Sequence, residues 1–511
     1  MRRAFLLALL LLAAAPAPSL AAESDTARAA RLFEAVRGQP ARLRLFLRGM
    51  PKGGDLHHHM AGSVYAEDLI DEAGQAGFCI AADGSAIVPP PCTSPAKQPA
   101  AGLPASDPAL YGTLIDRLSM RSRVSGGGPG WSDHDHFFDT FGRFASIAGH
   151  APGRVLAEVR TIAAADNVTY IETQTNPPAM GEAAALATAR RVPADDPATA
   201  YALLAPDMPR LIAKGRGQTD AMERDATRRL GCDRAARRAA CAVTVRYQAV
   251  AIRNLAPQVV FAQLHYAFAL ADADPRYVGV NIVAPEDGPV ALADYARHMA
   301  MLRFLGQRYP KVAMSLHAGE LTRGLVPPAA LRDHIAKAVE AGARRIGHGV
   351  DILYEADAPQ LLTRMARERI AVEINLTSND LILGVRGADH PLALYRAAGV
   401  PTVLSTDDEG VARSDMTNEY VRAVTDQGLG YAELKAMARA SIRYSFLPGE
   451  SLWRADAIGT PSPACRGADP TRPMPPGDCG RVIALSEKAR EEWRLERAFA
   501  DFEKRIGSAP F

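Results

Sequence analysis

The sequence has little excess charge and no long apolar stretch in its interior. Its 59 basic and 57 acidic residues leave a formal net charge of +2, so we expect no nucleic-acid or membrane-surface partner. Beyond residue 22 no apolar run is long enough to cross a bilayer, and we predict no membrane span in the mature chain. Internal repeats are also absent, which favours one large domain with additions over the 511 residues.

The first 22 residues are typical of a secretory signal peptide. Arg2 and Arg3 precede the apolar run Ala4–Ala15, and small residues follow up to Ala22. The run is too short to span a bilayer comfortably. We therefore predict cleavage after Ala21 or Ala22 and a periplasmic or secreted protein. The alternative is a retained N-terminal anchor.

The six cysteines lack the CxxC spacing of a metal site or a redox pair. They fall into three sequence-local pairs, and export would place them in an oxidising compartment. Reduced, buried thiols are the alternative. The expected disulfides are the nearest-neighbour set, Cys79–Cys92, Cys232–Cys241 and Cys465–Cys479.

Short apolar runs alternate with helical patterns over residues 51–450, which predicts a parallel sheet. Eight such runs are present, so the expected fold class is α/β, a (β/α)8 TIM barrel. The first strand is expected to end at His57. The other seven are expected at Val168–Glu172, Ala242–Tyr247, Tyr277–Val283, Val312–Leu316, Arg345–Gly347, Ile370–Ile374 and Thr402–Ser405.

Three additions to the barrel are expected. Residues 23–50 have the pattern of a helical lead-in, and residues 451–511 form a C-terminal extension that ends in a charged helix from about Leu485 to Phe502. Residues 79–112 are rich in Pro, Ala and Ser and are predicted to be a disulfide-bearing insertion after the first strand, with a hairpin turn at Asp83-Gly84.

Four phenylalanines recur at helical spacing after a glycine-rich loop: Phe137, Phe138, Phe141 and Phe144. Two interpretations are open. The side chains pack into the core, or they form an apolar wall over a pocket.

Polar residues follow several of the predicted strands, where (β/α)8 enzymes carry their catalytic groups. His57 and His59 point to the same face because side chains alternate along a strand. His317 directly follows an apolar strand, and His348 lies between two glycines, which we interpret as room for a ligand.

Three acids complete this set. Glu320 comes three residues after His317 and could also be a carboxylate at a helix N-terminus. Asp407 and Asp408 follow the last strand, where solvated loop acids are the alternative.

Three imidazoles and one carboxylate suit Zn²⁺, which lowers the pKa of a bound water to about 7. The remaining groups, His348 and Glu320, are then available for proton transfer. A second metal would normally need a bridging ligand, often a modified lysine. The fourth strand has no lysine, so we predict one zinc per chain.

Five motifs, in order, resemble those of the adenosine deaminase family. They are Pro51-Lys52-x-x-Asp55-Leu56-His57-x-His59, Leu316-His317-Ala318-Gly319-Glu320, Arg345-Ile346-Gly347-His348-Gly349, Thr377-Ser378-Asn379 and Ser405-Thr406-Asp407-Asp408. The export signal and the cysteine-bearing insertion are similar to the family's secreted, growth-factor-type branch.

The resemblance implies zinc-dependent removal of the 6-amino group of adenosine or 2′-deoxyadenosine. It implies that the zinc ligands are His57, His59, His317 and Asp407. It further implies that Glu320 protonates purine N1 and that His348 and Asp407 orient and deprotonate the attacking water. Asp408 would bond N7, and Ala284 and Gly319 would contact the substrate.

Two positions differ from the family pattern. Met60-Ala61-Gly62 replaces Leu-Asp-Gly, whose acid contacts the ribose, and Ala284 replaces a glycine whose amide meets N3. The expected partner is therefore a small purine nucleoside whose sugar is read differently. An amidohydrolase of the same fold with another amine or amide substrate, and a catalytically silent binding protein, are the alternatives. The sequence leaves the oligomeric state open, a dimer included.

Overall fold

The computed structural model describes residues 24–125, 132–234 and 238–506. The signal peptide predicted over residues 1–22 lies outside the described residues. No described helix is both long and apolar enough to cross a membrane.

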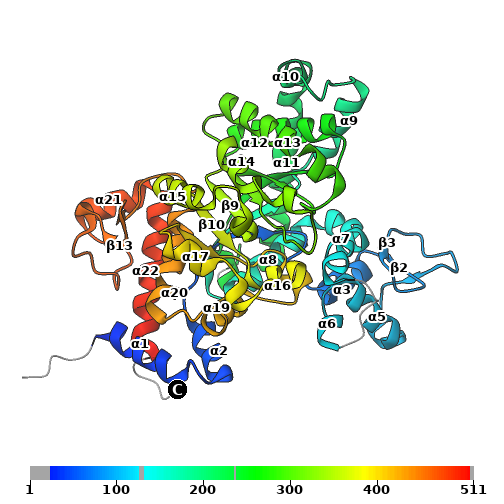
Figure 1. The fold of residues 1–511 in the computed structure, drawn as a ribbon. Helices are drawn as coiled ribbons and strands as arrows, with labels where there is room; N and C mark the ends of the chain where they lie inside the picture. Colours follow the sequence, from blue (N-terminus) through cyan, green and yellow to red (C-terminus); the bar gives the residue numbers. More distant parts are fainter. Residues whose placement is uncertain (1–23, 126–131, 235–237, 507–511) are drawn as a thin grey trace, which may run out of the picture.

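Eight parallel strands form the centre of the molecule, and each pairs with the next one along the chain. The ends of this sheet meet at a parallel bridge between His58 and Asp407, where the Asp407 N–H donates to the His57 carbonyl at 2.8 Å. Helices surround the strands (Figure 1), so the predicted (β/α)8 barrel is confirmed. The strands are β1 (Gly53–His59), β5 (Val168–Thr175), β6 (Thr244–Ile252), β7 (Tyr277–Val283), β8 (Ala313–Ala318), β9 (Arg345–His348), β10 (Ala371–Ile374) and β11 (Thr402–Leu404).

Helices cover the outer face of the strands and the barrel interior takes the inner face, so most strand residues are buried with little alternation. Several helices begin with proline at the first turn, where a missing N–H costs nothing. The helices that follow the insertion are α8 (Pro152–Ala165), α9 (Met180–Ala189), α10 (Pro197–Leu204), α11 (Met208–Leu230), α12 (Pro257–Ala273), α13 (Pro289–Arg308), α14 (His334–Ala341), α15 (Ala358–Glu368), α16 (Leu376–Leu383), α17 (Leu392–Ala397), α18 (Glu409–Ala412), α19 (Met416–Thr425) and α20 (Tyr431–Arg443).

A lobe inserted between β1 and β5 projects from the side of the barrel (Figure 1). Its hairpin turns at Gly84, as predicted, and helix α7 packs against it. Ser146 Oγ donates to the Ile87 carbonyl at 2.9 Å and Arg143 donates to the Ser85 carbonyl at 2.6 Å. The elements of the lobe are α3 (Ala66–Gln75), β2 (Cys79–Ala81), β3 (Ile87–Val88), β4 (Lys97–Pro99), α4 (Leu103–Ser106), α5 (Pro108–Leu118), α6 (Ser122–Ser125) and α7 (Asp133–His150).

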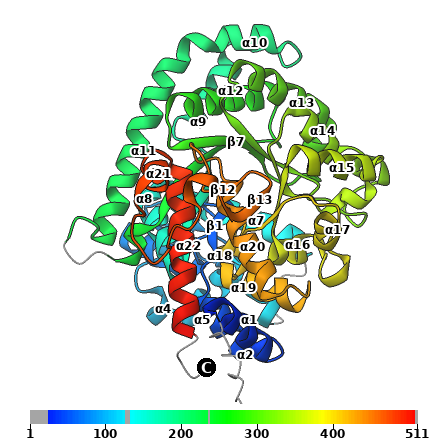
Figure 2. The same cartoon turned by 90° about the vertical axis from the view of Figure 1, so that its left-hand side faces the viewer.

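The lead-in and the C-terminal extension pack on each other. Helices α1 (Asp25–Val36) and α2 (Pro40–Gly49) meet α22 (Glu487–Ile506), which crosses the barrel in Figure 2. Phe46 contacts both Tyr431 and Phe502 edge-on, with ring centroids 5.8 and 5.4 Å apart. The extension also contains β12 (Trp453–Arg454), β13 (Ala457–Pro461) and α21 (Gly477–Leu485).

All six cysteines form disulfides. The pairs are Cys79–Cys92, Cys232–Cys241 and Cys465–Cys479. The nearest-neighbour pairing is therefore confirmed.

Candidate metal centre and active-site pocket

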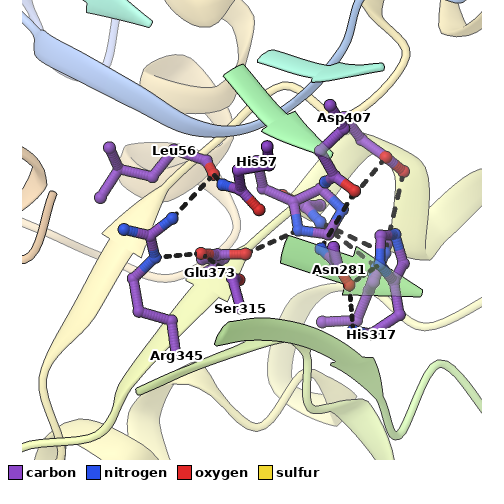
Figure 3. Close-up of polar contacts among 12 residues, drawn as sticks. Leu56, His57, Asn281, Ser315, His317, Arg345, Glu373 and Asp407 are labelled. Atoms are coloured by element: carbon purple, nitrogen blue, oxygen red, sulfur yellow. Dashed lines mark hydrogen bonds and ion pairs between the residues drawn. The ribbon is translucent and has the colours of Figure 1, made fainter. Parts of the chain in front are cut away.

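Four strand ends bring three of the predicted metal ligands together with His348, which was predicted to act on the attacking water. His57, His317, His348 and Asp407 each offer a ligand atom within 4.8 Å of the others. His59 joins them through Asp407, whose Oδ1 lies 3.1 Å from His59 Nε2 and 3.4 Å from His57 Nε2. Figure 3 shows His57, His317 and Asp407 pointing toward one another.

His57 and His59 face the cluster, and His58 faces away from it, as the alternation along a strand predicts. The Nδ1 atom of His58 lies 2.9 Å from Thr173 Oγ1 instead. The strand register therefore delivers two imidazoles to one side of β1.

The orientation of His57 is fixed from behind by Glu373. His57 Nδ1–H donates to Glu373 Oε2 at 2.8 Å, so Nε2 is the nitrogen free to bind a metal. Nε2 is buried and has no hydrogen-bond partner. Hydrogen bonds of this kind, from a ligand's second nitrogen to a carboxylate, are typical of metal sites.

A chain of charges extends from Glu373 into the barrel (Figure 3). Arg345 donates from Nε to Glu373 and from Nη2 to Glu172 at 2.5 Å, and all three side chains are buried. Burial alone would raise the pKa of Glu373, but Arg345 and His57 lower it to about 2. Glu373 is thus a permanent carboxylate behind the candidate ligand His57.

Gly347, the residue before His348, leaves the space that the His57 imidazole occupies. A Cβ atom at Gly347 would lie 2.6 Å from His57 Cε1. Our interpretation that the glycines around His348 leave room for a ligand was therefore wrong at Gly347, because the imidazole of His57 fills that space.

Two of the three other candidate ligands, His317 and Asp407, are held in the same manner. His317 Nδ1 lies 3.1 Å from Asn281 Oδ1, which accepts its proton and leaves Nε2 for a metal. Asp407 Oδ2 accepts from Ser378 Oγ at 2.6 Å, which leaves Oδ1 toward the imidazoles. The set of imidazole nitrogens and one carboxylate fits Zn²⁺, and neighbours orient His57, His317 and Asp407.

A relay of hydrogen bonds sets the proton position on His348. The Leu392 N–H can only donate, so His390 Nδ1 accepts it at 3.2 Å and His390 Nε2 carries the proton. His390 Nε2–H then donates to Asn379 Oδ1 at 3.0 Å, and Asn379 Nδ2–H donates to His348 Nδ1 at 2.9 Å. Burial lowers the pKa of His390 to about 4 and that of His348 to about 3. Neutral His348 therefore carries its proton on Nε2.

The proton of His348 faces Glu320. His348 Nε2 lies 3.5 Å from Glu320 Oε1 and 4.0 Å from Asp407 Oδ2. Burial raises the pKa of Glu320 well above its usual range, and the charges of Asp407 and Glu286 add to the effect. A carboxyl group that keeps its proton at neutral pH can act as a general acid.

Glu320 lies in a loop and not at a helix N-terminus, so that alternative was wrong. The loop is held by buried Glu286, whose carboxylate accepts from the N–H groups of Gly319 and Glu320 at 3.2 and 2.9 Å. His334 Nδ1 lies 2.6 Å from the same carboxylate. Gly319 is not among the pocket-lining residues, and its N–H donates to Glu286. Its contact with the substrate stays a prediction.

The predicted substrate residues Asp408 and Ala284 both line the pocket. Asp408 is buried and its Oδ1 has no hydrogen-bond partner. Burial, with the charge of Asp407, raises its pKa well above the usual value. A Cβ atom at Gly62 would lie 1.7 Å from Asp408 Oδ1, so Gly62 is required for this position of the acid.

Ala284, His348 and Asp407 adopt positive φ angles of 89°, 68° and 60°. Such angles are costly for residues other than glycine and are found at functional sites. At position 284 the angle explains the family's glycine, which this chain replaces with alanine.

The pocket has a volume of about 830 Å³, and its lining acids and histidines all belong to the metal centre or lie beside it. Phe137, Phe138, Phe141 and Phe144 all line it, and Phe137 and Phe144 are also almost fully buried. Both interpretations of these phenylalanines therefore hold: they pack into the core and form a wall of the pocket.

Sequence reasoning missed the residues that orient the ligands. Asn281, Glu286, Glu373 and His390 are far from the motifs in sequence or unremarkable within them. Glu373 had a usable signal, because it is a lone acid in the apolar run Ala371–Ile374. The others had none, since their roles depend on contacts between distant elements.

Comparisons with known proteins identify the family of this chain. The family model for adenosine deaminase matches residues 129–454. An adenine deaminase of Rhizobium johnstonii is 33% identical over 202 residues, which cover 39% of this chain and 56% of that protein. An adenosine deaminase of Shewanella loihica is 35% identical over 138 residues, 27% of this chain and 38% of that protein.

The matched segments thus span about half the length of these relatives or less. Among solved structures, the apo N6-methyl-AMP deaminase of Arabidopsis thaliana has a TM-score of 0.52 at 20% identity, covering 79% of this chain and 94% of that chain. This likeness shows the shared fold. With the family model matching well over half of its residues, the chain belongs to the adenosine deaminase family.

Proposed function

We propose that this chain removes the 6-amino group of adenosine and 2′-deoxyadenosine by hydrolysis, with one Zn²⁺ per chain. The observation that carries the proposal is the meeting of three kinds of group in one pocket. These are the neighbouring side chains of His57, His59, His317 and Asp407, the buried acid Glu320 beside His348, and the unpartnered Oδ1 of Asp408.

Zinc would be held by His57, His59, His317 and Asp407. When bound, it supplies Lewis acidity that makes hydroxide available at neutral pH. The side chains around it orient the water and take up its proton. Neutral His348 donates from Nε2 and orients the attacking water, and the Asp407 carboxylate takes up its proton.

Glu320 provides the second proton transfer. As the water oxygen adds to C6, electron density moves onto N1, and Glu320 delivers a proton there. The amino group then leaves as ammonia with the proton that Asp407 took from the water, the C6 hydroxyl proton restores Glu320, and the product is the 6-oxo purine. Burial keeps the Glu320 proton in place until this step.

Asp408 is suited to bond purine N7. N7 is a hydrogen-bond acceptor, so its partner must donate, and burial favours the protonated, donating form of Asp408. Gly62 leaves the space that this side chain needs.

We also propose that the mature protein is periplasmic or secreted. The disulfide pairing of every cysteine is typical of an oxidising compartment. Sequencing the N-terminus of the protein recovered from the periplasm tests this, and a start at Met1 would contradict it.

An ammonia-release assay tests the activity. Adenosine and 2′-deoxyadenosine should release ammonia, and adenine and AMP are assayed beside them for comparison. Metal analysis of the same protein should find about one zinc per chain. If ammonia came from none of these compounds, another amine or amide substrate would replace the purine. A reproducible two metals per chain would contradict the single-zinc site.

A further inference from the structure

We propose that the preferred substrates are purine nucleosides with an uncharged, apolar group on the 5′ carbon, such as a 5′-alkylthio group. The inference rests on the proposed function and names a substrate class for the same site. It is carried by the half of the pocket that lies beyond the metal centre.

The orientation of the purine follows from the reacting atoms. C6 must face Asp407 and Glu320, and N7 must face Asp408. In a purine, N9 is on the opposite side from C6. The sugar and anything attached to its 5′ carbon must therefore extend away from the metal centre.

Outside the metal centre most lining residues are apolar, and the polar side chains there, Gln174, Thr175, Asn176 and Gln218, are uncharged. Along α7, the four phenylalanines, Ala145 and Ala148 form one side, and Pro152, Val155, Met222 and Tyr277 are further lining residues. Tyr277 presents no free hydroxyl, since its oxygen bonds Thr219 Oγ1 at 2.9 Å. Apolar groups of a ligand would be sheltered from water here.

The described lining residues include no lysine and no arginine. The charged or ionisable ones, His59, His317, Glu320, His348, Asp407 and Asp408, are all at the metal end. A 5′-phosphate would bring up to two negative charges into an apolar space without a cation to pair with, which is strongly unfavourable. The pocket is therefore built against nucleotides.

Uncharged polar side chains also line the pocket, and Gln174 is the one suited to the sugar. Gln174, at the end of β5, lines the pocket and is 2% exposed. Its Oε1 accepts from Asn281 Nδ2 at 3.0 Å, and its buried Nε2 has no partner. This donor can meet a ribose oxygen or N3, so a nucleoside uses it and the apolar wall together.

The wall is supported from outside by the inserted lobe. Helix α7 is attached to the β2–β3 hairpin by the bonds from Ser146 and Arg143. The hairpin is closed by the Cys79–Cys92 disulfide. The insertion thus helps to position the surface that would select the 5′ group.

The test compares kcat/KM for adenosine, 5′-deoxy-5′-methylthioadenosine, its 5′-benzylthio analogue and AMP on the full zinc-loaded protein. We expect the alkylthio compounds to exceed adenosine by about tenfold or more, the range for one apolar group in an apolar pocket. AMP should fall below adenosine by about a hundredfold or more, because its phosphate has no partner. AMP equal to adenosine, or alkylthio compounds well below adenosine, would overturn the proposal.

A variant pair assigns the effect to the wall. Phe141→Ala should lower the ratio of alkylthio to adenosine activity about tenfold. Phe304→Ala is the matched control, since Phe304 is also half-buried on a helix but does not line the pocket. It should leave the ratio unchanged. An unchanged ratio in Phe141→Ala would count against the proposal.

Binding separates this proposal from the proposed function. If no 6-aminopurine released ammonia, the deaminase function would fail. Calorimetry would then still decide the pocket's preference, because 5′-methylthioadenosine should bind at least tenfold more tightly than AMP. If 5′-methylthioadenosine bound no more tightly than AMP, this inference alone would be contradicted.

Discussion

The two ends of the pocket are built differently. At the metal end, side chains from separate strands meet, and each is oriented by another buried polar group: His57 by Glu373, His317 by Asn281 and Asp407 by Ser378. At the far end, one helix of the inserted lobe supplies most of a smooth apolar wall.

The difference shows that this chain uses separate parts of the pocket for the reaction and for selecting the substrate. Directional hydrogen bonds hold reacting atoms within a few tenths of an ångström, and the rigid barrel is where such precision is available. Apolar contact is non-directional and tolerates variation in shape. A wall on an added lobe can therefore change the accepted substituent without disturbing the metal centre.

The largest effect is expected from Glu320→Gln at the metal end. Glutamine has the same shape but cannot deliver a proton to N1, so kcat should fall by about 10²-fold or more. Steady-state kinetics and metal analysis measure this, with zinc retained. Glu340→Gln, an exposed acid of α14, is the control. Near-normal turnover by Glu320→Gln would remove the acid from the mechanism.

Next comes Glu373→Gln, which changes no ligand. The amide is a weaker acceptor for His57 Nδ1–H and leaves Arg345 with one carboxylate instead of two. Metal affinity should fall by about 10- to 100-fold. Competition with a zinc chelator measures it, and exposed Glu368→Gln serves as the reference. Unchanged affinity would show that Glu373 acts only on the fold.

A smaller loss is expected from His390→Leu, which acts through Asn379. Without the donor at His390 Nε2, the Asn379 amide can turn and His348 can carry its proton on either nitrogen. We expect a loss in kcat of about tenfold with little change in KM.

The control for that experiment is His390→Gln, whose amide can still donate to Asn379 and should restore part of the rate. If His390 had a purely structural role, the variant would have a lower melting temperature, and kcat would fall by the same factor at every pH. An altered shape of the pH–kcat profile would instead indicate the relay.

The smallest effect concerns Ala61, which lines the pocket where relatives have an acid for the ribose. Because a site without a polar partner cannot penalise a missing hydroxyl, adenosine and 2′-deoxyadenosine should differ by less than about tenfold in kcat/KM. Ala61→Asp should increase the preference for adenosine. A strong preference already present in the unaltered protein would mean that another group reads the 2′-hydroxyl.

Much of this protein was determined by local sequence. Apolar runs followed by polar residues gave the eight strands and the candidate ligands, and the two-residue period placed His57 and His59 on one face. The spacing of the cysteines predicted their pairing, and the spacing of the phenylalanines predicted a single helical face. These features depend on neighbours along the chain, which a periodic pattern records.

Only the tertiary structure decided which groups orient the metal centre. Glu373 lies behind His57, and Glu286 holds the Glu320 loop across 34 residues of sequence. Gly347 is required by an imidazole from β1, and His390 reaches His348 through Asn379. Closing a barrel brings distant strand ends within hydrogen-bonding distance, and a buried polar atom must then find its partner among whatever meets it there. That partner leaves no periodic trace in the sequence.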